Sequence, residues 1–233
     1  MKDIFIITSA IGNEYGIYSY QERFNQLLET IDSIETYAPN AHICIYEMSD
    51  DAIPENDLET LKQRILFIAQ YYKHPYLAQF KNVGGDDTNR TAKKTVGELL
   101  AMTEFLTWLN HQTIKFGRVF KISGRFKLNS NFDKVDYTQH TGKVVIRPKQ
   151  NWYGDSTYYL RLWSFDYSLL PEISKMFDSI NLYNYDNNKR DGTLRILEYS
   201  ICKFLTELKI PVFEARVVGL EGCFGQDGAK VYE

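Results

Sequence analysis

The chain has 233 residues, of which 44% are hydrophobic and 24% are charged, and its formal net charge at pH 7 is -3. This composition is typical of a globular protein with a substantial buried core, and the length fits one large domain or two small ones. A slightly acidic chain gives no sign of the basic surface that nucleic-acid binding usually requires, so we expect no nucleic-acid partner.

Cysteine usage and the N-terminal stretch predict the compartment. Cys44, Cys202 and Cys223 have no metal-ligand spacing and form no even set for disulfides, as is typical of reduced core thiols in a cytoplasmic protein. The apolar run within residues 1–11 is too short to span a membrane, and it fits a first core strand better than a signal peptide. We therefore expect a cytoplasmic protein without a membrane span.

The first part of the chain has the pattern of a βαβ unit. A nearly continuous apolar run at 4–8 predicts a strand covered on both faces, and apolar residues at helical spacing predict a helix over 24–37. A second buried strand is predicted at 42–48, so the two strands should be parallel and joined by a right-handed crossover. A short helix at 57–64 and a third strand at 65–68 follow.

The remaining elements are predicted in a less regular order. A Gly-rich loop over 71–90 is of the kind that is functional or disordered, and a long helix capped by Thr91 or Thr95 then continues to about Asn110. The later elements are a strand beginning at 118, strands at 143–147 and 158–165, a helix at 166–178, a polar loop at 181–192, a helix at 193–208, a strand at 212–218 and a Gly-rich tail at 219–228. Because no repeat or change of composition divides the chain, we expect one α/β domain.

The segment RVFKISGRFKLN, residues 118–129, places cations just past the end of a strand. The strand breaks at Ser123-Gly124, and its end carries Lys121, Ser123, Gly124, Arg125, Lys127 and Asn129. Ligands of open α/β sheets bind outside the carboxyl ends of the strands, so this end is a candidate anion site. The alternative is a surface bend whose cations are only solvated.

Several common site motifs are absent from the sequence. It contains no GxGxxG, no P-loop, no HExxH, no CxxC pair and no GxSxG. These absences argue against dinucleotide, P-loop, zinc-protease and α/β-hydrolase sites. The four histidines are scattered, and we interpret them as structural: His42, His74, His111 and His140.

In layout, roughly residues 1–230 resemble GT-A-type glycosyltransferases. The resemblance is carried by ITSAIG after the first strand, by the following helix and strand, by the helix KKTVGELLAMTEFLTW and by RVFKISGRFKLN. It implies one GT-A-like (Rossmann-like) α/β domain over residues 1–233, with a mostly parallel central sheet flanked by helices. Residues 1–130 would form the nucleotide-binding half, and residues 131–233 would form the acceptor-side half.

The resemblance also implies a donor site for a nucleotide sugar. It assigns Ser9 and Ala10 to the nucleotide, Asp50 or Asp51 to the base or ribose, Thr95 and Glu98 to the sugar, and Ser123, Gly124 and Arg125 to the pyrophosphate.

One departure from the family pattern concerns the metal-binding DxD, because no Asp-x-Asp occurs in this sequence. A divalent metal (Mn or Mg) normally neutralises the departing diphosphate. Here Arg125, helped by Lys121 or Lys127, would do so, since arginine makes bidentate contacts with phosphate. Alternatively, dispersed carboxylates such as Asp50 and Asp51 hold a metal, or the transferase activity has been lost.

Catalysis with inversion requires a general base near the acceptor hydroxyl, usually a carboxylate. The candidates are Glu198 and Asp227. The alternative for Glu198 is a solvated or core-capping glutamate, and the alternative for Asp227 is a turn residue before glycine. Trp152, in a loop that would close over the acceptor, and Trp163 are candidates for stacking on the acceptor sugar, although Trp163 is also a natural core residue.

We therefore expect a glycosyltransferase that moves a sugar from a nucleotide-sugar donor to a glycan or small-molecule acceptor. The first alternative is a catalytically inactive relative that binds a nucleotide or glycan. A methyltransferase with a similar open sheet ranks last, because the loop after the first strand, ITSAIGN, offers only one glycine.

Overall fold

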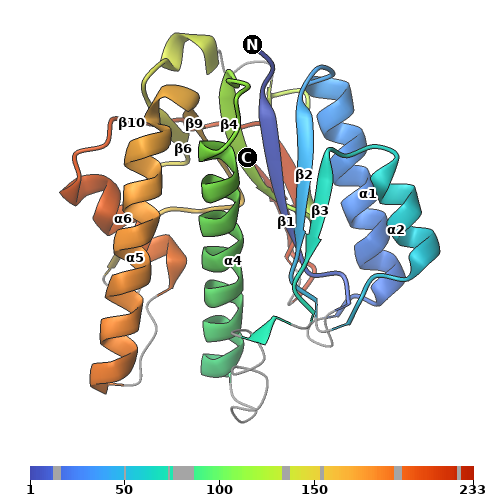
Figure 1. Cartoon of the computed structure of the whole chain (residues 1–233), viewed down its shortest axis with the longest axis horizontal. Coiled ribbons are helices and arrows are strands. Elements are labelled where there is room, and N and C mark those ends of the chain that lie inside the picture. The colour runs from blue at the N-terminus through green and yellow to red at the C-terminus, as the bar shows by residue number, and fades with distance from the viewer. Residues whose placement is uncertain are drawn as a thin grey trace.

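In a computed structural model, the chain forms a central sheet with helices packed on both faces (Figure 1). The described residues are 1–12, 17–49, 51–72, 74–75, 87–132, 137–152, 155–191, 196–224 and 227–233. Within these ranges, the side chains of 87–93, 152 and 188–191 are not described.

The main sheet is mostly parallel, as predicted. Among the described residues it contains seven strands, in the order β10 (Val212–Glu214), β6 (Val144–Ile146), β9 (Leu162–Asp166), β4 (Arg118–Ser123), β1 (Ile4–Ser9), β2 (His42–Glu47) and β3 (Phe67–Gln70). β1 pairs in parallel with β2 and with β4, and β2 pairs in parallel with β3. β9 runs antiparallel to both of its neighbours, β4 and β6. The predicted α/β fold class with a mostly parallel central sheet is thus confirmed.

Helices cover both faces of this sheet. α1 (Tyr20–Tyr37) and α2 (Glu55–Lys62) lie on one face, and α4 (Asp87–Asn110), α5 (Leu170–Asp191) and α6 (Leu197–Glu207) lie on the other (Figure 1). Ser19 and Glu22 form a reciprocal capping box at the start of α1, which satisfies backbone N–H groups that the helix leaves unpaired. In the part of the chain that the structure describes, no helix is both long and apolar enough to cross a membrane.

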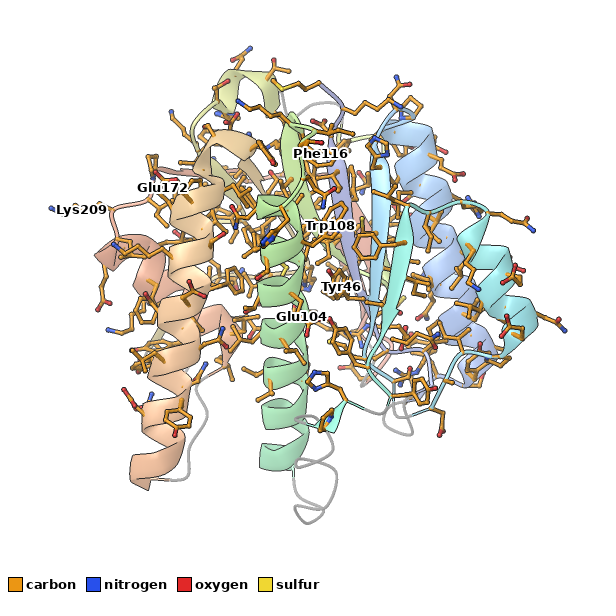
Figure 2. The ribbon with its side chains drawn as sticks, viewed as in Figure 1. Tyr46, Glu104, Trp108, Phe116, Glu172 and Lys209 are labelled. Carbon is orange, nitrogen blue, oxygen red and sulfur yellow. The ribbon has the colours of Figure 1, made fainter. Side chains whose placement is uncertain are left out.

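Aromatic side chains fill the space between α4 and the sheet. Figure 2 shows Tyr46, Trp108 and Phe116 between α4 and the strands. The Trp108 ring centroid lies 4.9 Å from that of Phe67 and 6.4 Å from that of Phe116. Such edge-to-face and tilted pairs add stability beyond the burial of their area. The high aromatic content of the chain therefore serves its core on this face.

Short strands beyond the main sheet were not predicted. β5 (Phe126–Leu128), β11 (Leu220–Cys223) and β12 (Lys230–Tyr232) form a second, antiparallel sheet, and β7 (Gln150–Trp152) pairs with β8 (Asp155–Thr157). Single 3-10 turns occupy Tyr137–His140 and Tyr167–Leu169. The Gly-rich tail predicted at 219–228 thus contributes a strand that pairs with β5, directly after the central strand β4.

The prediction of a polar loop at 181–192 is wrong, because α5 continues to Asp191. Three of its asparagines face neighbouring structure: Asn184 and Asn187 are buried, and Asn181 Nδ2 donates to Thr103 Oγ1 of α4 at 3.0 Å. Apolar periodicity cannot detect a helix face that packs through amides. Other boundaries also shifted: α4 begins at Asp87, β3 lies at 67–70, and α6 begins at Leu197.

Candidate functional site

The carboxyl ends of β1, β2 and β4 lie at one edge of the sheet, the lower edge in Figure 1. The loop after β1, the buried side chains of α4, the turn after β4 and the first turn of α6 meet there. This edge, which we call the carboxyl edge, holds most of the predicted site residues: Ser9, Ala10, Thr95, Glu98, Lys121, Ser123, Gly124, Arg125 and Glu198.

The turn after β4 packs directly against the end of β1. The Gly124 amide donates to the Thr8 carbonyl at 2.9 Å, and the Ser123 amide donates to the Arg161 carbonyl at 2.9 Å. A Cβ at position 124 would lie 3.3 Å from the Ser9 Cβ, so glycine allows the close approach. The predicted nucleotide loop and the predicted pyrophosphate turn are therefore neighbours.

Arg125 is a partly buried cation without a carboxylate of its own. Its Nε is inaccessible and has no hydrogen-bond partner among the described residues. Burial lowers the pKa of Arg125, and the nearby Arg23 guanidinium lowers it further, against the opposing effect of Glu98. An anion at this position would supply the missing acceptor.

Lys121, in contrast, is fully engaged within the protein. Its Nζ forms an ion pair with Glu98 and donates to Ser123 Oγ at 3.0 Å and to the Leu160 carbonyl at 2.8 Å. Burial lowers the pKa of Lys121. Burial also acts to raise the pKa of Glu98, but Lys121, Lys94 and Arg125 together more than offset this, so the pKa of Glu98 is lowered. Because the ammonium has three donors and three internal partners, the prediction that Lys121 assists at the diphosphate is corrected.

Lys127 is also turned to other partners. Its Nζ lies 3.4 Å from Glu29 Oε2 of α1 and 3.6 Å from Glu221 Oε1 of β11. Lys127 occupies the half-exposed position between two buried residues of β5. Its role at the diphosphate stays a prediction.

Two further arginines near Arg125 were not predicted. Arg23 of α1 donates to the carbonyls of Tyr18 and Ala10, both at 3.1 Å. Arg161 forms an ion pair with Glu233, and its guanidinium carbon lies 4.1 Å from the ring centroid of Tyr159. Neither residue belongs to a recognisable motif, so the sequence offered no signal for their convergence.

Glu47 organises the loop after β1 and was also missed. It is buried at the end of β2, where Oε1 accepts from the amides of Ile11 at 2.9 Å and Ser49 at 3.0 Å, and from the Ser49 hydroxyl. Ser49 Oγ in turn accepts from the Gly12 amide at 2.6 Å. An acidic residue that closes an otherwise apolar strand, HICIYE, was the available signal.

Replacing Glu47 by glutamine should change the pH dependence of stability. Burial raises the pKa of Glu47, although hydrogen bonds from Ser49 and Ser9 oppose the rise. The folded state therefore holds the proton more tightly than the unfolded state, so this contribution to stability is complete below the ordinary pKa and is lost as pH rises through the raised one. In urea titrations across that window, Glu47→Gln should lose less stability with rising pH than the wild type.

A matched variant separates charge from hydrogen bonding. Glu47→Ala also removes the acceptor for Ile11 and Ser49, so it should destabilise the protein at every pH. Identical pH profiles for the wild type and Glu47→Gln would contradict the assignment.

The two predicted bases have different surroundings. Glu198 lies in the first turn of α6, with Oε1 3.6 Å from Nζ of Lys94, and it is close enough to Lys121 to affect its pKa. Asp227 is exposed in the turn between β11 and β12, where Oδ1 accepts from the Ala229 amide at 3.0 Å. Its surroundings match the alternative interpretation, a turn residue, so Glu198 is the better candidate.

The structure describes only some of the residues predicted to contact the acceptor sugar and the nucleotide base. Trp163 is 2% exposed and packs against Phe165 and Phe177 in the core, so its assignment to the acceptor is corrected. The Trp152 side chain and Asp50 lie outside the described residues. Asp51 is exposed in the bend after β2.

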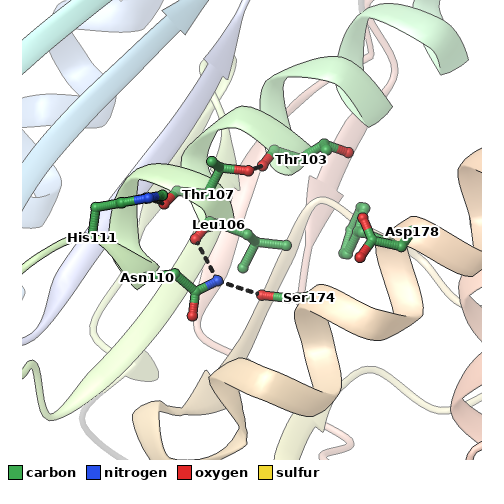
Figure 3. A pocket seen from close by; sticks show the side chains of 8 residues that line it. Thr103, Leu106, Thr107, Asn110, His111, Ser174 and Asp178 are labelled. Atoms are coloured by element: carbon green, nitrogen blue, oxygen red, sulfur yellow. Dashed lines mark hydrogen bonds between the residues drawn. The ribbon is translucent and has the colours of Figure 1, made fainter.

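A separate pocket of about 160 Å³ lies between α4 and α5 (Figure 3). It is lined by Thr103, Leu106, Thr107, Asn110, His111, Ser174, Phe177 and Asp178. Asn110 Nδ2 donates to the Leu106 carbonyl at 3.0 Å and to Ser174 Oγ at 2.9 Å, so its amide joins the two helices. The pocket contains none of the predicted site residues.

Comparisons with known proteins do not identify a family. No protein-family model matches the chain, and no curated protein matches it. The proposal for its function therefore rests on the chemistry of the carboxyl edge.

Proposed function

We propose that the protein is a GT-A-type glycosyltransferase that moves a sugar from a nucleotide-sugar donor to a glycan or small-molecule acceptor. The observation that carries the proposal is Arg125, a partly buried residue whose inaccessible Nε has no partner among the described residues. It stands at the edge of the sheet where α/β proteins bind their ligands. A donor diphosphate offers the oxygens that this guanidinium lacks.

The position of the loop after β1 supports a nucleotide beside that diphosphate. Ser9 is packed against Gly124, one residue before Arg125. The loop is fixed by Glu47 and Ser49, which bind the amides of Ile11 and Gly12. A preorganised loop reduces the entropy lost when a ligand is bound.

Glu198 supplies the second chemical function that transfer requires. In the proposed reaction, its carboxylate takes the proton from the acceptor hydroxyl as the acceptor oxygen bonds to the anomeric carbon. The bond from that carbon to the diphosphate oxygen breaks, and the nucleoside diphosphate leaves with the electron pair. Arg125 stabilises the negative charge that develops on the leaving group. Thr95 and Glu98 are buried on the α4 side of the same edge, where the sugar would lie.

The second candidate function is a nucleotide- or glycan-binding protein without catalysis. This candidate is favoured by the ion pair between Lys94 Nζ and Glu198 Oε1, which lie 3.6 Å apart. In that pair the proposed base already has a cation as its partner. The Asp227 carboxylate is also engaged in its own turn. Binding would then occur without transfer or donor hydrolysis.

A ligand panel combined with a Glu198→Gln variant tests the two functions. Nucleoside diphosphates, nucleotide sugars and S-adenosylmethionine are screened by thermal shift, and turnover of each stabilising donor is measured. One nucleotide should stabilise both proteins, because binding free energy adds to stability. Loss of a general base should lower turnover by about 10²- to 10⁴-fold in the variant.

The outcomes separate the candidates. Glu172→Gln is the control, since Glu172 is exposed in the first turn of α5, at the end of the molecule away from the carboxyl edge (Figure 2). This variant should turn over the donor like the wild type. Binding without turnover in the wild type would favour the second candidate. No stabilisation by any nucleotide would contradict the transferase and leave the second candidate only as a glycan-binding protein. Stabilisation by S-adenosylmethionine instead would favour a methyltransferase.

A further inference from the structure

The described carboxylates at the carboxyl edge do not form a set that fits the divalent metal that the family resemblance implies. Glu98 is paired with Lys121, Glu233 is paired with Arg161, and Glu47 binds amides and hydroxyls of its own loop. Asp51 is exposed. Within the described ranges, no group of three or more His, Cys, Asp or Glu side chains is placed to hold a metal ion. A hard cation needs several oxygen ligands together, and the buried carboxylates at this edge are already engaged.

The cations at the same edge need an anion and not a metal ion, because one of them lacks a counterion. Lys121 and Arg161 each contact a buried carboxylate, and Arg23 is close enough to Glu47 to interact electrostatically. Arg125 has a neighbouring carboxylate in Glu98, but that group forms its ion pair with Lys121. Of these four cations, Arg125 is thus the one that lacks a carboxylate of its own.

The surroundings of Arg125 favour an anion over a second cation. Arg23 and Arg161 both act on Arg125 as like charges, and their repulsion is strengthened where water is excluded. A divalent metal placed beside these guanidinium groups would add to the repulsion. A diphosphate would relieve it and would accept hydrogen bonds from Arg125.

We propose that Arg125 neutralises the donor diphosphate in place of a divalent metal, so that donor binding is independent of metal. The proposal rests on the proposed function and specifies how the donor is held. The guanidinium is planar and presents paired N–H groups, which match two phosphate oxygens. Arg23 and Arg161 raise the positive potential at this position while they hold the surrounding backbone and the β11–β12 segment.

Calorimetric titration with uridine diphosphate, guanosine diphosphate and inorganic pyrophosphate tests the proposal. Each probe is added to wild type, Arg125→Lys and Arg125→Met, in chelator and in manganese. At least one probe should bind the wild type in chelator. Manganese should change the dissociation constant of that probe by less than about threefold, well under the tenfold change that corresponds to about 1.4 kcal/mol. Arg125→Met should weaken binding by about 10- to 100-fold, the value of a charge-assisted hydrogen bond. Arg125→Lys should fall between the two, because it keeps the charge without the planar pair of donors.

Thermal unfolding without ligand distinguishes a binding residue from a structural one. Because the partly buried guanidinium lacks a carboxylate of its own, Arg125→Met should melt at or above the wild-type temperature. Arg216→Met, at an exposed arginine after β10, should leave probe binding unchanged.

The possible results have distinct meanings. Binding that requires manganese and is lost in chelator would overturn the metal-independent proposal and leave the transferase proposal standing. A marked loss of stability in ligand-free Arg125→Met would also overturn it, because Arg125 would then serve the fold. The absence of binding under both conditions would overturn both proposals.

Discussion

Replacing Lys121 by methionine should destabilise the protein by about 3–5 kcal/mol, the usual cost of removing one partner of a buried ion pair. Lys121 is 2% exposed, and its removal would leave the buried Glu98 carboxylate without its partner. The Ser123 hydroxyl and the Leu160 carbonyl would also lose a hydrogen bond. Urea denaturation at pH 7 measures the loss as a lower midpoint at unchanged slope.

A double variant tests whether the missing counter-charge is the cause. Lys121→Met with Glu98→Met removes both charges, and it should recover much of the lost stability because no buried charge remains unpaired. The surface pair Lys203–Glu207 is the control, since Lys203→Met should cost less than about 1 kcal/mol. Equal losses at Lys121 and Lys203 would contradict the account.

The pH dependence gives an independent check on the same pair. In Lys121→Met, Glu98 becomes a buried carboxyl without its main cation, so its pKa should rise from the lowered position that it has in the wild type. The protonated form needs no counter-charge. The difference in stability between the wild type and Lys121→Met should therefore shrink as the pH falls.

Sequence patterns predicted the part of the fold that depends on continuous apolar runs. All six residues of β1 are buried, and the helix after it carries its apolar residues on one face. The short strands β5 and β11 gave no such signal, because three or four residues are too few to establish a period, even where they alternate as in Phe126-Lys127-Leu128. Their pairing depends on contacts between segments that are far apart in the chain.

The position of the site was predictable, but the partners of its charges were not. Parallel strands end at one edge, so the turn after β4 marked that edge from the sequence. Lys121 and Arg125 lie four residues apart, yet only Lys121 has its own carboxylate. That difference depends on Glu98, which α4 brings to β4, and no local pattern reports it. Trp163 was ambiguous for a related reason: an aromatic residue in a strand can face a ligand or the core.

Replacing Gly219 by alanine should also have a large effect on folding. Gly219 has φ +76, and a Cβ built there would lie 2.1 Å from the Phe132 backbone nitrogen and 2.2 Å from its Cα. The conformation costs roughly 1–2 kcal/mol for a residue with a side chain, and the overlap adds roughly 1–3 kcal/mol. Because the Asn129 amide donates to the Gly219 carbonyl at 3.0 Å, a shift at 219 would disturb the pairing of β5 with β11. Urea denaturation measures the expected total.

Gly142→Ala separates the two contributions to this loss. Gly142 has a similar φ of +66, but no atom lies within 4 Å of a Cβ built there. Its replacement should therefore cost only the conformational part, about 1–2 kcal/mol. The excess loss in Gly219→Ala then measures the contact with Phe132, and equal losses would show that the contact relaxes without cost. A large excess would show that the close approach of Gly219 to the Phe132 backbone helps to hold the β11–β12 hairpin in place. The Phe224 ring centroid just after β11 lies 4.6 Å from the Arg161 guanidinium carbon.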